Sequence, residues 1–92
     1  MAEAELLEKV KTQLNITGNY QDETLKGYIR EVQEYLRDAG VKDEVINSPA
    51  SVGVIARGVS DIWNFGSGSV NLSPYFKERV IQLTFKEVWY AI

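Results

Sequence analysis

The sequence predicts an all-α protein, a small bundle of four main helices formed by residues 1–92 as a single domain. Apolar residues recur at spacings of three and four in four stretches, at about residues 3–14, 22–39, 49–64 and 74–90, which is the pattern of amphipathic helices. Between these stretches lie glycine, asparagine and two Ser-Pro pairs, which favour turns and helix starts. The 92 residues are enough for one hydrophobic core, and a composition of 45% apolar and 25% charged residues is typical of soluble globular proteins.

The first predicted helix buries a stripe of leucine and valine on one face. The stripe consists of Leu6, Leu7, Val10 and Leu14. We expect Lys11 to lie on the solvent side, paired with Glu8 as a helix-supporting ion pair. The segment Asn15–Asn19 then ends the helix, because its residues favour turns and left-handed backbone.

The second predicted helix has the clearest apolar stripe of the chain. Its members are Leu25, Tyr28, Ile29, Val32, Tyr35, Leu36 and Ala39. Asp22 is the expected N-cap, because its carboxylate suits the open amides of the first turn. Gly40 suits the left-handed position just past the helix. A further short helical turn is expected near residues 43–47.

Ser48-Pro49 predicts the start of the third helix, since proline at the first helical position sacrifices no helical hydrogen bond. Its apolar stripe comprises Val52, Ile55, Val59, Ile62 and Trp63. Small residues at Ala50, Gly53, Ala56 and Ser60 form a path along which another helix is expected to approach closely. A strand is the rival interpretation for residues 52–55, but the placement of glycine and arginine disturbs a period of two.

Ser73-Pro74 opens the last predicted helix in the same way. Phe76, Val80 and Leu83 form its buried face. A second apolar line, rotated from the first, comprises Ile81, Phe85, Val88, Trp89 and Ile92. The apolar arc is therefore too wide for a small monomer to cover, and we expect a large groove or a partner molecule to shield it.

The residue types that are absent limit the chemistry. The sequence has no cysteine and no histidine, which excludes disulfides, thiolate metal sites and imidazole catalysis. Acidic pairs such as Glu31 with Glu34 fall on the predicted solvent face, and Gly66–Ser69 lacks the ending of a phosphate-binding loop. We therefore expect neither an enzyme nor a protein with a cofactor or a metal.

The charge balance disfavours nucleic acid and membrane as binding partners. Ten basic against thirteen acidic residues give a net charge of −3, too little clustered positive charge for a strong phosphate grip. The first residues are acidic rather than basic, and no apolar run approaches the length that spans a bilayer. The expectation is a cytoplasmic, soluble protein without a membrane partner.

The third helix carries a polar line whose role has two interpretations. Arg57 and Asp61 lie four residues apart, which fits an ordinary ion pair within the helix or a contact with a neighbouring subunit. Trp63 and Trp89 are equally ambiguous, because tryptophan fills cores and is also enriched at interface hot spots.

Two long segments carry a family resemblance. Residues 48–68 and 72–83 resemble the head–tail connector (portal adaptor) family of tailed bacteriophages and prophages. The most specific block is residues 55–66, which read Ile-Ala-Arg-Gly-Val-Ser-Asp-Ile-Trp-Asn-Phe-Gly. The opening helix and the helix bearing Tyr28 to Leu36 look like the first half of the same family.

The resemblance implies a structural virion protein. Such an adaptor forms a homo-oligomeric ring on the portal protein, extends the DNA channel and receives the next neck or tail-completion protein. It implies a location in the host cytoplasm during assembly and in the virion neck afterwards, with free protein that can be monomeric. DNA would pass through the channel without sequence-specific binding.

These inferences select one set of candidate interface residues for contact with a subunit or another partner. The set is Arg57, Asp61, Trp63, Phe65, Gly66, Gly68, Phe85, Trp89 and Ile92. The alternative function is a small phage-encoded helical module that lays an apolar helix into a groove of a host protein. A helix-turn-helix DNA binder is disfavoured, because the third helix offers Arg57 as its one basic residue.

Overall fold

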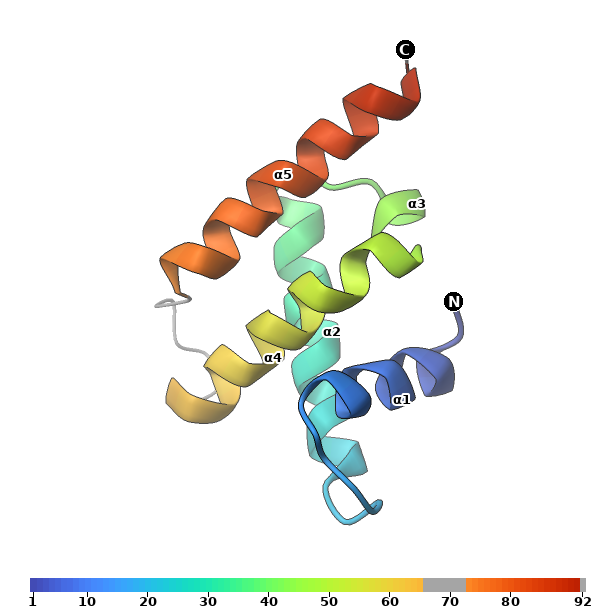
Figure 1. Cartoon of the computed structure of the whole chain (residues 1–92), viewed down its shortest axis with the longest axis vertical. Helices are drawn as coiled ribbons and strands as arrows, with labels where there is room; N and C mark the ends of the chain where they lie inside the picture. The colour runs from blue at the N-terminus through green and yellow to red at the C-terminus, as the bar shows by residue number, and fades with distance from the viewer. Residues whose placement is uncertain (66–72, 92) are drawn as a thin grey trace.

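The chain folds into helices joined by short connections (Figure 1). The computed structural model describes residues 1–65 and 73–91, and for residues 65 and 85–91 it describes the backbone alone. The elements are α1 (Glu3–Gln13), α2 (Asp22–Asp38), α3 (Asp43–Ile46), the 3₁₀ turn η1 (Pro49–Ser51), α4 (Val52–Phe65) and α5 (Pro74–Ala91). The all-α prediction is confirmed, and the rival strand over residues 52–55 is wrong, because this segment is the first turn of α4.

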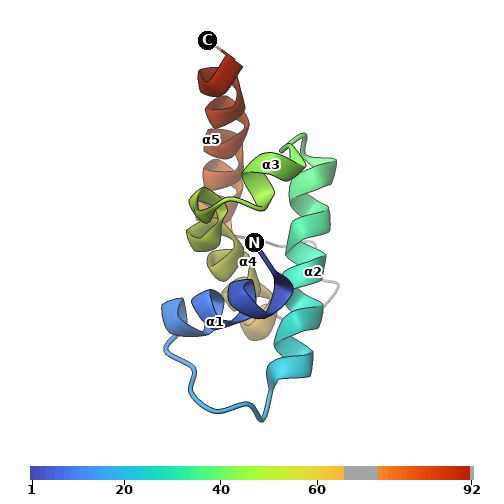
Figure 2. The same cartoon turned by 90° about the vertical axis from the view of Figure 1, so that its right-hand side faces the viewer.

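The helix α4 occupies the centre of the bundle and contacts α1, α2 and α5. Figure 1 shows α2 behind α4, and Figure 2 shows α2 along one side of the molecule with α1 and α5 on the other. The core between them is apolar, and its largest fully buried side chains are Phe76, Leu25, Ile29, Leu36, Ile46 and Ile55. Five of these six belong to the four main predicted helices, so the helical periodicity identified most of the core correctly. Ile46 belongs to α3, the short helical turn predicted near residues 43–47.

Two helices end in the left-handed backbone that the sequence predicts. After α2, Gly40 has φ +98°, and the amide of Val41 donates to the carbonyl of Leu36 at 3.0 Å. After α1, Asn15 has φ +58° and the amide of Ile16 donates back into the last turn at 2.9 Å. Both ends therefore satisfy carbonyls that the helix leaves open.

The expected N-cap role of Asp22 is wrong. Asp22 is the first residue of α2 rather than its cap, and no side chain caps this helix. Lys11, which we expected at the solvent side, is 6% exposed, and its Nζ lies 2.8 Å from Asp22 Oδ1 and also donates to the carbonyl of Gly18. The expected pair with Glu8 is present but longer, at 3.9 Å. The buried ammonium therefore ties α1 to the loop and to the start of α2, because the loop supplies one of its acceptors, Gly18, and α2 supplies the other, Asp22.

The start at Ser48-Pro49 lies where the sequence predicts it, but with different chemistry. Pro49 takes the first position of η1, whereas the hydroxyl of Ser48 donates to the carbonyl of Val45 at 2.7 Å instead of capping the turn. The hydroxyl of Ser51 donates to the carbonyl of Ile46. The serines thus bind α3 to η1 and stiffen the entrance to α4.

The close helix approach occurs at Gly58 and not along the predicted path of small residues. A Cβ at Gly58 would lie 2.6 Å from Phe76 Cε1 and 2.9 Å from a methyl carbon of Val32. At Gly53, on the predicted path, a Cβ would meet nothing within 4 Å. The absence of a side chain at Gly58 therefore lets α2 and α5 pack directly on α4. Within the described residues, no helix combines the length and apolar character that crossing a bilayer requires.

Candidate functional site

Arg57 and Asp61 lie one turn apart on α4, and their surroundings differ. The side chain of Asp61 is 4% exposed, whereas that of Arg57 is 47% exposed. Arg57 Nε lies 3.5 Å from Asp61 Oδ1, so the predicted ion pair within the helix is present. Because one partner is buried and the other half exposed, the pair has an inward, structural end and an outward end that a neighbour can reach.

The inward end joins α4 to α5. Asp61 Oδ2 accepts hydrogen bonds from the amide of Ser73 at 3.2 Å and from its hydroxyl at 2.8 Å. Ser73 Oγ in turn accepts from the amide of Phe76 at 3.1 Å, which is the N-cap that Ser73-Pro74 predicts. The buried carboxylate therefore holds the first turn of α5 against α4, and its role is structural.

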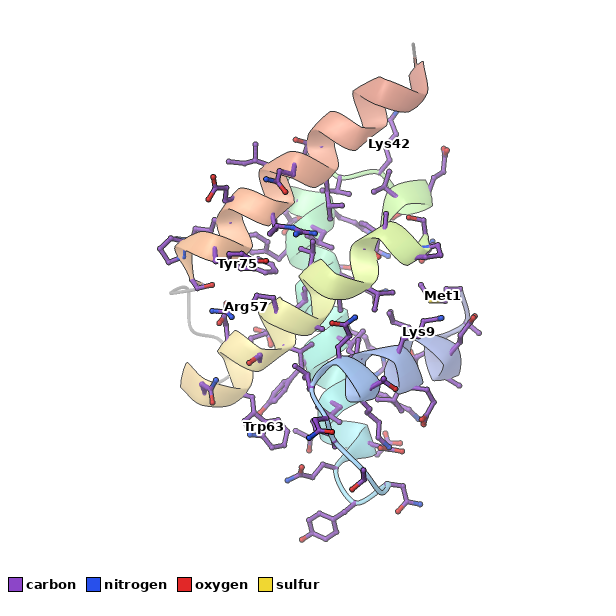
Figure 3. All side chains as sticks on the ribbon, viewed as in Figure 1. Met1, Lys9, Lys42, Arg57, Trp63 and Tyr75 are labelled. Carbon is purple, nitrogen blue, oxygen red and sulfur yellow. The ribbon has the colours of Figure 1, made fainter. Side chains whose placement is uncertain are left out.

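The outward end packs on an aromatic ring. The guanidinium carbon of Arg57 lies 5.2 Å from the centroid of the Tyr75 ring, within the range of a cation–π contact (Figure 3). Beside them is an open depression of about 290 Å³. It is lined by Gln13, Leu14, Gly53, Ala56, Arg57, Ser60 and Tyr75. Three of the four residues on the predicted path of small residues, Gly53, Ala56 and Ser60, thus line this depression.

Trp63 stands at the edge of the bundle rather than in its centre. It is 42% exposed, and its ring makes an edge-to-face contact with Tyr28 of α2, at 6.1 Å between centroids and 87° between planes. Figure 3 shows it near the end of α4, away from the core. A large part of this side chain is therefore available to a partner.

The buried face predicted for α5 is confirmed, because Phe76, Val80 and Leu83 are 0–4% exposed. Ile81, which begins the second apolar line, is 55% exposed. The C-terminal part of α5 extends beyond the other helices in both views (Figures 1 and 2). Of the candidate interface set, the remaining members lie outside the described side chains or residues: Phe65, Gly66, Gly68, Phe85, Trp89 and Ile92.

The chain matches one family model, that of the phage gp6-like head-tail connector protein, over residues 4–87. The chain belongs to this family. No curated protein and no solved structure matches it in the other two comparisons. The predicted connector resemblance is confirmed, both for residues 48–68 and 72–83 and for the first half of the chain, because the match covers all of these segments.

Two features of the connector surface do not stand out in the sequence. Nothing distinguishes Tyr75 from any other residue of a helix start, although its ring lies against Arg57. Arg79 lies one turn further along α5, and its Nε is buried without a hydrogen-bond partner among the described residues. The one feature of the sequence that could have identified this pair is the spacing of four residues, which places both side chains on one side of α5. Among residues 1–65 and 73–91, no three acidic side chains lie close enough together to hold a metal ion.

The role of Asp61 as the link between α4 and α5 predicts a stability effect. We expect Asp61→Ala to lower the free energy of unfolding by about 1–3 kcal/mol, because it leaves the Ser73 amide without its acceptor. Chemical denaturation measures the change. Asp38→Ala is the matched control, since Asp38 is exposed and should change stability by less than about 0.5 kcal/mol. Equal stability of the two variants would contradict the structural role.

Proposed function

We propose that the protein is a structural adaptor of the phage neck, which assembles as a ring under the portal, extends the DNA channel and joins the filled head to the tail. The observation that carries this proposal is the connector family match over residues 4–87. The surface agrees with it, because Arg57, Trp63 and Tyr75 are of residue types that are enriched at interface hot spots, and all three are substantially exposed.

A closed ring requires two different surfaces on each subunit, so that every copy contacts its neighbours head to tail. The exposed side chains of Arg57 and Trp63 on α4 supply contacts for one candidate surface. The exposed Ile81 on α5 begins an apolar line that supplies another surface for the portal or the next neck protein. The interface set predicted from the sequence is part of this proposal, except for Asp61, whose buried carboxylate binds Ser73 of the same chain.

A channel lining that lets DNA slide must not bind phosphate strongly. The net charge of −3 supports this requirement, since a general grip on DNA depends on many basic contacts that displace counterions. We therefore expect no sequence-specific DNA binding and only weak, strongly salt-dependent binding to any duplex.

The direct test is to mix the purified protein with portal rings of its own phage at several concentrations. Electron microscopy and sizing should reveal an added ring on the portal, even where the free protein is monomeric. No affinity for portal rings would overturn the proposal. Stoichiometric capture of one host protein in place of the portal would support a host-binding module instead.

Trp63→Ala separates an interface role from a core role. We expect it to cost about 1–2 kcal/mol of stability, because a partly exposed tryptophan loses its edge-to-face contact with Tyr28 but leaves no large cavity. Binding to the portal rings should fall at least tenfold. Tyr20→Ala is the control, since Tyr20 is 95% exposed on the loop between α1 and α2. A Trp63→Ala variant that docks normally would remove Trp63 from the interface.

A further inference from the structure

The two halves of the chain carry opposite excess charge. Residues 1–50 hold ten acidic and six basic side chains, whereas residues 51–92 hold three acidic and four basic. Since like charges repel across an interface and opposite charges attract, this imbalance favours contacts between unlike halves of neighbouring copies.

Three of the ten acidic side chains of the first half line up on the outer face of α2. Glu31, Glu34 and Asp38 follow each other at spacings of three and four, and all three are exposed. We call them the acidic stripe. Arg37 does not neutralise all of it, because its guanidinium lies between Glu34, at 3.0 Å, and Asp43, at 2.7 Å. The hydrogen bond to Asp43 raises the pKa of Arg37 above its ordinary value.

Asp38 is the member of the acidic stripe whose carboxylate is available to a partner. It makes no hydrogen bond or ion pair with any described residue, and it lies in the last turn of α2. A carboxylate near a helix C-terminus faces the negative end of the helix dipole. A cation from outside the chain is therefore favoured at this position.

The second half contributes two basic side chains, Arg57 on α4 and Arg79 on α5, to a group that also includes Tyr75. We call these three residues the basic socket. Tyr75 and Arg79 are one turn apart on α5, and Arg57 of α4 lies over the Tyr75 ring. The buried Nε of Arg79 has no acceptor within the part of the chain that the structure describes, although buried donors almost always have one. The residue as a whole is partly exposed, and a carboxylate of a neighbouring copy suits the fork of a guanidinium.

The stripe and the socket lie on opposite sides of the molecule. Figure 3 shows Arg57 and Tyr75 in front, on α4 and α5, while α2 runs behind α4, and Figure 2 confirms that α2 and α5 are on different sides. A copy whose α2 covers the socket of its neighbour keeps its own socket open for the next copy. Such a heterologous contact repeats, and it closes when the rotation between copies divides a full turn.

We propose that the basic socket of one copy binds the acidic stripe of a second copy. In this contact, Arg57 and Arg79 of one copy bind the carboxylates of Asp38 and Glu34 of the other. The proposal rests on the proposed function, because it names the subunit contact of the ring. A second copy is favoured over another occupant because the chain itself presents the complementary charge, on the side where a head-to-tail neighbour needs it.

A charge swap between copies tests the contact. Arg57→Glu and Asp38→Lys should each reduce ring formation on portal rings by tenfold or more, whereas an equimolar mixture of the two variants should recover it. In the mixture, the reversed socket of one variant meets the reversed stripe of the other, and the remaining contacts are native. Lys9→Glu and Glu5→Lys are the matched controls, with the same charge changes at exposed positions of α1.

The outcomes separate the two proposals. If the wild-type protein forms no ring on the portal, the proposed function fails. If it does form one, and the single reversals assemble normally or the mixture does not recover, the charge contact is wrong while the function stands. Arg57→Glu places a second carboxylate beside Asp61, so its fold is checked by circular dichroism. Asp38→Lys changes only an exposed side chain and tests the contact independently.

Discussion

Replacing Phe76 by alanine is expected to lower the free energy of unfolding by about 3–5 kcal/mol, the largest effect that we predict for a single substitution. Phe76 is fully buried at the point where α5 crosses the bundle. Its ring lies 5.3 Å from that of Tyr35 on α2, and it covers the bare backbone of Gly58 on α4. Its removal opens a cavity between three helices that cannot collapse, because each is fixed by its other contacts.

Such a loss is a large part of the total for a domain of this size, which is typically about 5–15 kcal/mol. Urea denaturation followed by circular dichroism measures it. Ile81→Ala is the matched control on the same helix, because Ile81 is 55% exposed and should lose less than about 1 kcal/mol. If Phe76→Ala unfolds at the urea concentration of this control, the ring of Phe76 does not fill the space between the three helices.

The second large effect is expected at Gly58. In an open helix, replacing glycine by alanine stabilises by about 1 kcal/mol. At Gly58 the added methyl group would overlap the buried ring of Phe76 and the stiff side chain of Val32. Forcing these neighbours apart costs about 1–3 kcal/mol or more. We expect Gly58→Ala to be less stable than the wild type by about 1–2 kcal/mol and Gly58→Val to be worse.

The chain supplies its own control for Gly58. Gly53 lies on the same helix, and a Cβ there would meet nothing within 4 Å. Gly53→Ala should therefore raise the midpoint of thermal unfolding, while Gly58→Ala lowers it. A rise in both midpoints would mean that α2 and α5 yield easily at this crossing.

The helices were predictable because their information is local. Apolar spacing located each helix, and residues such as Gly40 and Ser73 marked where helices end or begin through hydrogen bonds within a few residues. The burial of Lys11 was not predictable from its charge. It follows Leu7 by one helical turn and so occupies the core stripe, but its ammonium is tolerated only because the loop brings Gly18 and Asp22 to it.

The candidate site was predictable only in part, for the same reason. Arg57 with Asp61 is a local pair, and Ser73 is a local cap, so each was visible in the sequence. The hydrogen bonds that join Asp61 to Ser73 depend on how α5 packs on α4. Likewise, nothing local distinguishes Gly58 from Gly53, since only the direction in which each faces decides which one another helix covers.

The bonds of Asp61 to Ser73 and the burial of Phe76, Val80 and Leu83 hold the first part of α5 against the bundle. The eight residues of α5 that follow Leu83 span about 12 Å at 1.5 Å per residue. They act as a lever arm, because each degree of tilt at Leu83 displaces the end of the helix by about 0.2 Å. A force on this end is therefore transmitted to the buried contacts of α5, and loosening these contacts widens the range of positions that the end can occupy.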